Sequence, residues 1–252
     1  MYKMIKNFSL GTFKSSNNWN NYKLNIINLQ RNFYFSKMSV DIQAYLWPTP
    51  NGKKIYVVLE ELNIPYDVRL INIGKNEQFA PEFLKISPNN KIPAIVDQNP
   101  PKEFGDSPIS IFESAAILQY LADYKKGEGA PDLYPKNPRE RVKVNEWLYW
   151  QIAGLGPMMG QSNHFSSTNI DYAKERYSKE VDRLLGVMNK RLGEYNYLAG
   201  DNYTIADIAS YTWLLYSDKV KAEDTPYPNI KAWFERISER PAVKRAAEKA
   251  NL

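Results

Sequence analysis

The segment Ser87–Asp97, with the sequence SPNNKIPAIVD, combines a loop, a proline and a short apolar run. Its first four residues are turn formers, and Ala94-Ile95-Val96 predicts a strand. Pro93 cannot donate a hydrogen bond within a sheet, so it belongs at the first residue of a strand or on a sheet edge. An X-Pro bond at such a corner is a candidate for the cis isomer. We then expect the Ile92 N–H and C=O to turn outward, where they can pair with an extended peptide as an added strand.

A second feature lies downstream, at Phe112-Glu113-Ser114-Ala115-Ala116, where a helix is predicted to begin. Free N–H groups at a helix N-terminus, together with a hydroxyl, can bind a carboxylate. The two features could therefore hold a small peptide, by its backbone on one side and by its carboxylate on the other. An ordinary loop, strand and capped helix would have the same spacing.

Several motifs, in the same order, resemble those of the glutathione transferases. NNKIPAIVD and SIFESAAILQYLA are similar to the glutathione-binding half of that family. TPNGKKIYVVLEEL, GEGAPDLYP and WLYWQIAGLGPMMGQ resemble its Nu class, which also includes a fungal nitrogen-metabolism regulator with a prion-forming tail. The resemblance runs from Val40 to the C-terminus. It implies an α/β thioredoxin-like N-terminal domain followed by an all-α C-terminal helical domain, the glutathione transferase architecture.

Composition excludes several kinds of chemistry. The 252 residues are 43% hydrophobic and 24% charged, as in ordinary globular proteins, and they include no cysteine. Disulfides, Cys-ligated metals and an enzyme thiol are therefore excluded, and any thiol chemistry must use a bound thiol. Because His164 is the single histidine, a multi-histidine metal site is excluded as well. The sequence contains no apolar run long enough to predict a membrane-spanning helix.

The basic charge is confined to the N-terminal segment. Residues 1–37 carry six basic and no acidic side chains, so the net charge of +5 leaves −1 for the remainder. A nearly neutral body lacks the basic surface that nucleic-acid binding requires.

Residues 1–38 are rich in Asn and aromatic residues, and three interpretations remain open for them. They are an organellar transit peptide, an Asn-rich disordered tail of the prion-like kind, or a leader upstream of a true start at Met38. The expected location is cytoplasmic, or mitochondrial if the segment is a transit peptide. In each case we exclude it from the fold.

Residues 39–124 are the predicted thioredoxin-like, glutathione-binding domain. Alternating and apolar runs predict strands, and periodic apolar positions predict helices. The strands are expected at Ile42–Leu46, Tyr66–Ile71, Ala94–Val96 and Ile109–Phe112, and the helices at Lys53–Leu62 and Ala115–Tyr124, with a further short helix near Leu84.

Residues 125–138 contain Gly and Pro throughout and predict a linker, after which residues 139–252 predict an all-helical domain. Gly154, Gly156 and Pro157 predict a kink rather than a phosphate-binding loop. Thr204 and Asp207 resemble a capping box with Asp in place of Glu. Other helices are expected at Arg139–Gln151 and Asp171–Leu192, and terminal helices between Trp233 and Ala250.

The resemblance places Thr49 opposite the glutathione sulfur, where a hydroxyl donor favours thiolate over thiol. Asn51 can donate an amide N–H to the same sulfur or to a bound disulfide. Thr and Asn beside prolines are also common turn residues, so spacing alone fits a loop. Tyr45 is the alternative, because other classes use a tyrosine in the first-strand region. Its alternation with Leu46 favours a packed strand position.

The remaining glutathione contacts are also implied by the resemblance. The Ile92 backbone would pair with the cysteinyl unit, with Pro93 setting the geometry. Glu113 would meet the γ-glutamyl ammonium, and Ser114 with the helix N–H groups would meet its carboxylate. Gln78 and Lys91 would serve the glycyl end or a second peptide, although Lys91 also fits a solvated surface charge.

The resemblance further implies a second glutathione or partner-subunit site. Arg176 matches a family arginine that can hold a carboxylate of a second glutathione. Its alternative is an i,i+4 surface pair with Glu180. Asn163 and His164 lie in a segment that the family places near the opening, where we expect His164 to be structural rather than a base.

These features predict a homodimeric, glutathione-dependent disulfide-bond oxidoreductase in which two glutathione molecules supply the thiols. One alternative is a glutathione S-transferase that conjugates electrophiles. Another is a non-catalytic glutathione-binding regulator that assembles through its Asn-rich tail. The expected partners are glutathione and a small-molecule disulfide or electrophile, with no metal, nucleic acid or membrane insertion.

Overall fold

The structure, a computed structural model, describes residues 40–250, and the expectations for residues 1–38 lie outside this range. It begins with a four-stranded sheet in the order β2-β1-β3-β4. β1 pairs with β2 in parallel and with β3 in antiparallel orientation, and β3 and β4 are antiparallel. This mixed sheet is the thioredoxin-like arrangement that the resemblance implied. The strands are β1 (Ile42–Leu46), β2 (Tyr66–Leu70), β3 (Ala94–Asp97) and β4 (Ile109–Phe112).

The corner before β3 has the predicted form. The Ile92–Pro93 bond is cis, and β3 begins at the next residue. The backbone N–H and C=O of Ile92 form no hydrogen bond within residues 40–250. The preceding loop is closed by Ser87, whose hydroxyl donates to the Lys91 carbonyl oxygen at 2.8 Å.

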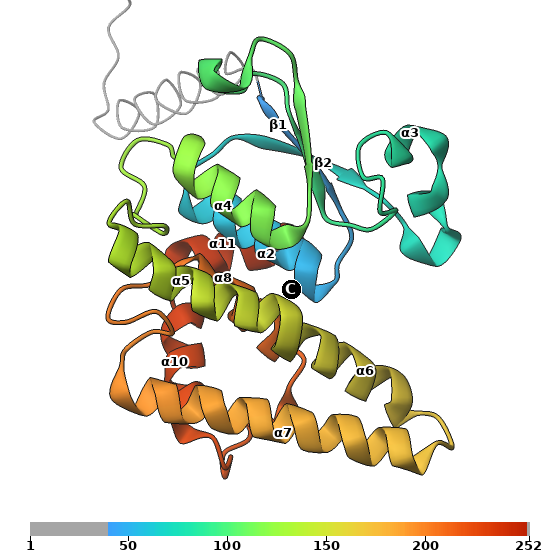
Figure 1. Cartoon of the computed structure of the whole chain (residues 1–252), viewed down its shortest axis with the longest axis vertical. Coiled ribbons are helices and arrows are strands. Elements are labelled where there is room, and N and C mark those ends of the chain that lie inside the picture. Colours follow the sequence, from blue (N-terminus) through green and yellow to red (C-terminus); the bar gives the residue numbers. More distant parts are fainter. Residues whose placement is uncertain (1–39, 251–252) are drawn as a thin grey trace, which may run out of the picture. The chain divides into compact units, whose positions relative to one another are not determined.

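Two helices, α2 (Pro50–Glu61) and α4 (Ser114–Tyr124), belong to the same half of the chain as the sheet and pack against each other (Figure 1). Helix α2 begins three residues before the predicted start at Lys53, because Thr49 is its N-cap and Pro50 occupies its first turn. The segment between β2 and β3 forms two 3₁₀ turns, at Ile73–Lys75 and Glu77–Phe79, before the short helix α3 (Pro81–Leu84).

The rest of the described chain is helical, as predicted. Where a kink was expected, residues Gln151–Leu155 form a π-helical turn, through which α5 continues into α6 without a loop. The terminal helices begin at Pro228, earlier than expected. None of the helices within residues 40–250 combines the length and apolar character needed to span a membrane. The helices are α5 (Pro138–Trp150), α6 (Gly156–Ser166), α7 (Asp171–Glu194), α8 (Ile205–Leu214), α9 (Asp218–Lys221), α10 (Pro228–Ser238) and α11 (Pro241–Ala250).

The capping box at the start of α8 is confirmed. Thr204 and Asp207 bond reciprocally across the first turn. The buried Asp207 carboxylate also accepts from the Leu198 N–H and from Trp233 Nε1, both at 2.9 Å. This single carboxylate therefore joins α8, α10 and the loop before α8.

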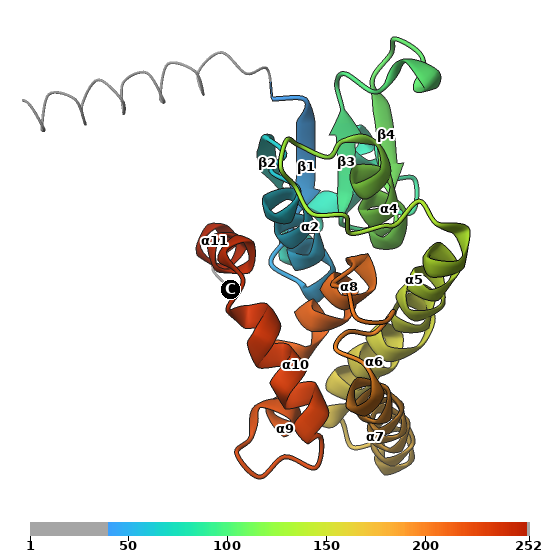
Figure 2. The ribbon, with the colours of Figure 1, turned by 90° about the vertical axis from the view of Figure 1, so that its left-hand side faces the viewer.

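Helix α2 is buried on its polar side as well as on its predicted apolar side. Ten of its twelve residues are buried, including Lys54, Glu60 and Glu61. Arg240 forms two hydrogen bonds to Glu61, at 2.6 and 2.8 Å, and Arg245 bonds to Glu60 at 2.9 Å. Because α2 contacts α4, α8 and α11, it belongs to the packing of both halves of the described chain (Figure 2).

Gly52 gives a test of how tightly α2 is held. A Cβ at this position would lie 2.1 Å from the Trp47 carbonyl oxygen, which is backbone and cannot rotate away. We expect Gly52→Ala to lower the free energy of unfolding by about 1–3 kcal/mol or more, measured by urea denaturation.

Gly186 in α7 is the matched control, because a Cβ there meets no atom within 4 Å. Gly186→Ala should be neutral or stabilise the protein by about 0.5–1 kcal/mol. Equal stabilities of the two variants would contradict the close contact between Gly52 and the Trp47 carbonyl oxygen.

Candidate functional site

A cavity of about 290 Å³ lies where α2, the N-terminus of α4, the π-helical turn, α6 and α8 meet. The sequence analysis predicted three of its lining residues, Asn51, Glu113 and Ser114, and the structure brings them together. It adds four side chains with polar groups that the sequence analysis did not propose for the site, Lys54, Gln151, Gln161 and Trp213. The cavity is thus built from segments far apart in the sequence.

Thr49 has the local role that fits a turn residue, as the N-cap of α2. Its hydroxyl oxygen accepts the Gly52 N–H at 3.2 Å and so caps α2. A hydroxyl has one donor in addition to its acceptor lone pairs, so the Thr49 proton can still be donated to a ligand. The side chain is half-buried.

The amide of Asn51 has a fixed orientation. Trp213 Nε1 donates to Asn51 Oδ1 at 3.0 Å. Because an indole N–H can only donate, the oxygen of the amide must face Trp213. The Asn51 NH₂ group therefore faces the other way and presents donors.

Lys54 is a buried ammonium in the second turn of α2. It is fully inaccessible to solvent, and its Nζ donates to Gln151 Oε1 at 2.7 Å and to Ser114 Oγ at 3.3 Å. Burial lowers its pKa to about 7, and the nearby Glu113 carboxylate partly opposes this shift. Within residues 40–250 no carboxylate forms an ion pair with Lys54.

Gln151 is also fully buried, at the start of the π-helical turn. Its Oε1 is occupied by Lys54, and its Nε2 has no hydrogen-bond partner in the described part of the chain. A Cβ on Gly156 would lie 2.8 Å from Nε2, so the glycine leaves room for this side chain. An unpartnered buried donor is costly, which makes it a marker for a ligand or ordered water.

Glu113 is held in an unusual backbone conformation immediately before α4. Its φ is +71° and its ψ is 115°, a region that costs a non-glycine residue about 1–3 kcal/mol. Its side chain is exposed, whereas that of Ser114 is buried. Such strain is concentrated at functional sites.

The other predicted first-site residues, Thr49 included, do not line this cavity. Gln78 has a buried Oε1 without a hydrogen-bond partner among the described residues, Lys91 is exposed, and Pro93 is buried. Tyr45 does not line the cavity either. Its hydroxyl donates to Gln43 Oε1 of the same strand, β1, at 3.2 Å.

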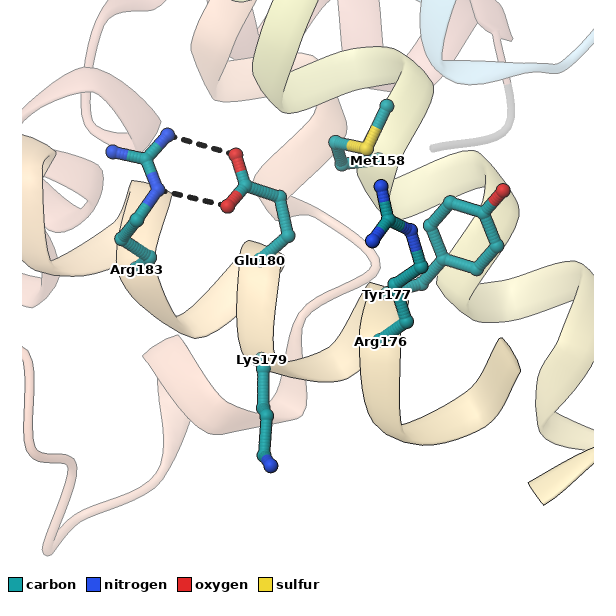
Figure 3. Close-up of a pocket in the computed structure, with 6 residues that line it drawn as sticks. All are labelled: Met158, Arg176, Tyr177, Lys179, Glu180 and Arg183. Carbon is teal, nitrogen blue, oxygen red and sulfur yellow. Dashed lines mark hydrogen bonds and ion pairs between the residues drawn. The ribbon is translucent and has the colours of Figure 1, made fainter. Parts of the chain in front are cut away.

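Arg176 lines a separate cavity of about 410 Å³ that shares no residue with the first. Figure 3 shows Arg176 with Met158 and Tyr177, which line the same cavity. The alternative, a pairing with Glu180, has no direct contact in the structure, where Glu180 accepts two hydrogen bonds from Arg183, at 2.7 and 2.8 Å. These bonds lower the pKa of Glu180, and the charge of Arg176 nevertheless helps to lower it. Arg176 itself forms no hydrogen bond or ion pair within residues 40–250.

Asn163 and His164 are exposed near the end of α6 and line neither cavity. The His164 ring lies edge-on to Phe165, at 5.0 Å between centroids. Phe165 in turn stacks on Tyr177 of α7, at 5.4 Å.

Comparison with known proteins matches both halves of this fold. The family described as "Glutathione S-transferase, N-terminal domain" matches residues 41–123, and "Glutathione S-transferase, C-terminal domain" matches residues 153–241. Disulfide-bond oxidoreductase YfcG of Escherichia coli is 48% identical over 214 residues, covering 84% of this chain and 96% of that protein. Protein URE2 of Candida albicans is 32% identical, covering 78% of this chain and 66% of that protein. A solved glutathione transferase family member from Pseudomonas fluorescens, with two glutathione bound, has a TM-score of 0.74 at 40% identity, over 83% of this chain and 93% of that chain.

The lowered pKa of Lys54 predicts a pH-dependent stability. The lysine keeps its proton up to about pH 10.5 when unfolded and releases it from about pH 7 when folded. Between these values the unfolded state binds more protons, so the Lys54 contribution to the free energy of unfolding rises with pH. Relative to Lys54→Met, the wild type should gain up to roughly 1 kcal/mol per pH unit in urea denaturation between pH 7 and 9.5.

Lys244→Met is the control, because the Lys244 side chain is 54% exposed. Its stability difference from the wild type should stay flat over the same pH range. A flat difference for Lys54→Met as well would contradict the burial of a charged ammonium.

Proposed function

The chain belongs to the glutathione S-transferase family, in the branch of YfcG and Ure2 that its motifs indicated, and from this premise we propose that it reduces disulfide bonds with bound glutathione. The observation that carries the proposal is the donor-lined cavity at the N-terminus of α4. The chain has no cysteine, so the thiol must come from its substrate. The disulfide-bond oxidoreductase activity in the name of its relative YfcG also supports the proposal.

In this proposal the γ-glutamyl end of glutathione occupies the cavity. Ser114 is buried at the first turn of α4, where N–H groups and the helix dipole favour a carboxylate. The exposed Glu113 carboxylate binds the ammonium on the same carbon.

The peptide backbone of glutathione pairs with Ile92, whose N–H and C=O have no partner within residues 40–250. Gln78 and Lys91 serve the glycyl end. The buried, unpartnered Oε1 of Gln78 supports its assignment, since it can accept a ligand N–H.

Thr49 and Asn51 act on the sulfur. The Thr49 hydroxyl proton is not used in capping α2, and the Asn51 NH₂ group is turned away from Trp213. Two donors directed at the sulfur favour thiolate over thiol, and the thiolate is the reactive species.

The reaction requires two glutathione molecules. The first thiolate attacks one sulfur of the disulfide, whose S–S bond breaks, and the leaving thiolate takes up a proton. A second glutathione thiolate then attacks the mixed disulfide, releasing the other thiol and forming glutathione disulfide. We assign a carboxylate of this second molecule to Arg176, which is not paired with Glu180.

The role of Thr49 predicts a difference between two substitutions. Thr49→Ala removes the hydroxyl donor and should lower kcat/KM for a small disulfide roughly 100-fold, as for other transition-state donors. Thr49→Ser keeps the hydroxyl and should stay close to the wild type. The capping loss of about 1 kcal/mol in Thr49→Ala is followed separately by thermal denaturation. Unchanged turnover of Thr49→Ala would contradict the role, and higher efficiency on an aryl halide than on the disulfide would favour a conjugating transferase.

Trp213 should act through Asn51. Trp213→Phe keeps a large ring but removes the indole donor that orients the Asn51 amide, so we expect kcat/KM for the disulfide to fall roughly 10-fold. Trp147→Phe is the control, because Trp147 packs against Trp150 and does not line the cavity. Equal effects of the two substitutions would indicate a general packing loss instead.

A further inference from the structure

We infer that Lys54 is a positioning residue for the substrate carboxylate: its buried ammonium turns Ser114 and Gln151 into hydrogen-bond donors and supplies the positive charge that the carboxylate meets in the cavity. The inference rests on the proposed function and extends it to a residue and a charge that the sequence did not point to.

The first step concerns hydrogen-bond direction. As an ammonium, Lys54 has only donors, so both groups that it contacts must accept from it. Ser114 Oγ accepts at 3.3 Å, which leaves the serine proton for a ligand. Gln151 Oε1 accepts at 2.7 Å, which turns the NH₂ group of this amide away from Lys54.

The second step concerns the unpartnered donor. Gln151 is fully buried, it lines the cavity, and its Nε2 has no partner among residues 40–250. Together with the Ser114 hydroxyl and the N–H groups at the start of α4, it forms a set of donors that matches an anion. A carboxylate, with two acceptor oxygens, satisfies this set.

The third step concerns charge. A fully buried lysine without an ion pair is rare, because desolvation of the ammonium is costly. Around Lys54, Glu113 is the charged group that acts on it, whereas the π-helical turn and α8 contribute Gln151 and Trp213, which do not titrate.

Three other charged groups on the helices that pack against α2 have partners away from Lys54. Arg245 and Lys249 of α11 bind Glu60, further along α2. Asp207 of α8 is held by Thr204 and Trp233. A carboxylate in the cavity would therefore supply the charge that Lys54 lacks.

This arrangement couples binding of the substrate carboxylate to protonation of Lys54. The pKa of Lys54 is about 7 in the empty cavity because of burial, and a bound carboxylate raises it. Above pH 7 binding must therefore take up a proton at Lys54, and the affinity must fall as the pH rises. Below pH 7 the lysine is already charged, so the affinity levels off.

The test is a calorimetric cycle with two ligands and two proteins. The ligands are S-methylglutathione, which has no titrating thiol, and its analogue with 4-aminobutanoyl in place of γ-glutamyl, which lacks the α-carboxylate. At pH 6.5 the wild type should bind the analogue roughly 10- to 100-fold more weakly. Lys54→Met should bind S-methylglutathione more weakly by a similar factor and should hardly distinguish the two ligands. Lys244→Met, with an exposed side chain, should bind as the wild type.

A second measurement needs no substitution. Between pH 6.5 and 8.5 the wild-type affinity for S-methylglutathione should fall, and titrations in buffers of different ionisation enthalpy should show uptake approaching about one proton per ligand.

Two results would overturn the inference while leaving the proposed function intact. One is that Lys54→Met weakens both ligands equally. The other is that the wild type binds S-methylglutathione with no pH dependence and no proton uptake. Absence of S-methylglutathione binding by the wild type would instead overturn the proposed function, and the inference with it.

Discussion

The packing of α2 between the sheet and the C-terminal helices is the constraint on which the candidate site depends. At its start, Gly52 lies against the Trp47 carbonyl so closely that a Cβ has no room. At its end, Glu60 and Glu61 are bonded by Arg245 and Arg240 from the C-terminal helices and the turn between them. Helix α2 therefore cannot shift without disturbing both halves of the described chain. For this reason Lys54, a side chain on α2, can be held in a fixed direction although its buried charge has no ion-pair partner among residues 40–250.

That rigidity determines the chemistry of the cavity. Two groups that can only donate, the Lys54 ammonium and the Trp213 indole, occupy the oxygens of Gln151, Ser114 and Asn51. On these three residues the groups left for a ligand are N–H and O–H donors, and they lie in the same cavity as the Glu113 side chain. Such a wall favours carboxylates and thiolates over neutral ligands, and glutathione carries both. The buried lysine is costly to the fold, but its cost falls when an anion is bound.

Features set by local chemistry could be predicted from the sequence. The cis Ile92–Pro93 corner, the extent of β1 and the capping box at Thr204 each depend on residues close together in the chain. The motif resemblance gave the fold, which the family match and the sheet order confirm. The donors of the cavity could not be found in this way. Lys54 contacts Ser114 and Gln151 across 60 and 97 residues, and Trp213 contacts Asn51 across 162. On α2 the charged positions opposite the apolar face were indistinguishable from a solvent-facing side, because nothing local indicates that other helices cover them.

The most direct test of this account is a crystal structure of the protein with glutathione bound. The account predicts the γ-glutamyl carboxylate in the cavity, within about 3.2 Å of Ser114 Oγ and Gln151 Nε2. It also predicts the sulfur beside Thr49 Oγ1 and the Asn51 amide nitrogen, with Trp213 Nε1 still bonded to Asn51 Oδ1. A carboxylate bound outside the cavity, with Gln151 Nε2 still unpartnered, would contradict it.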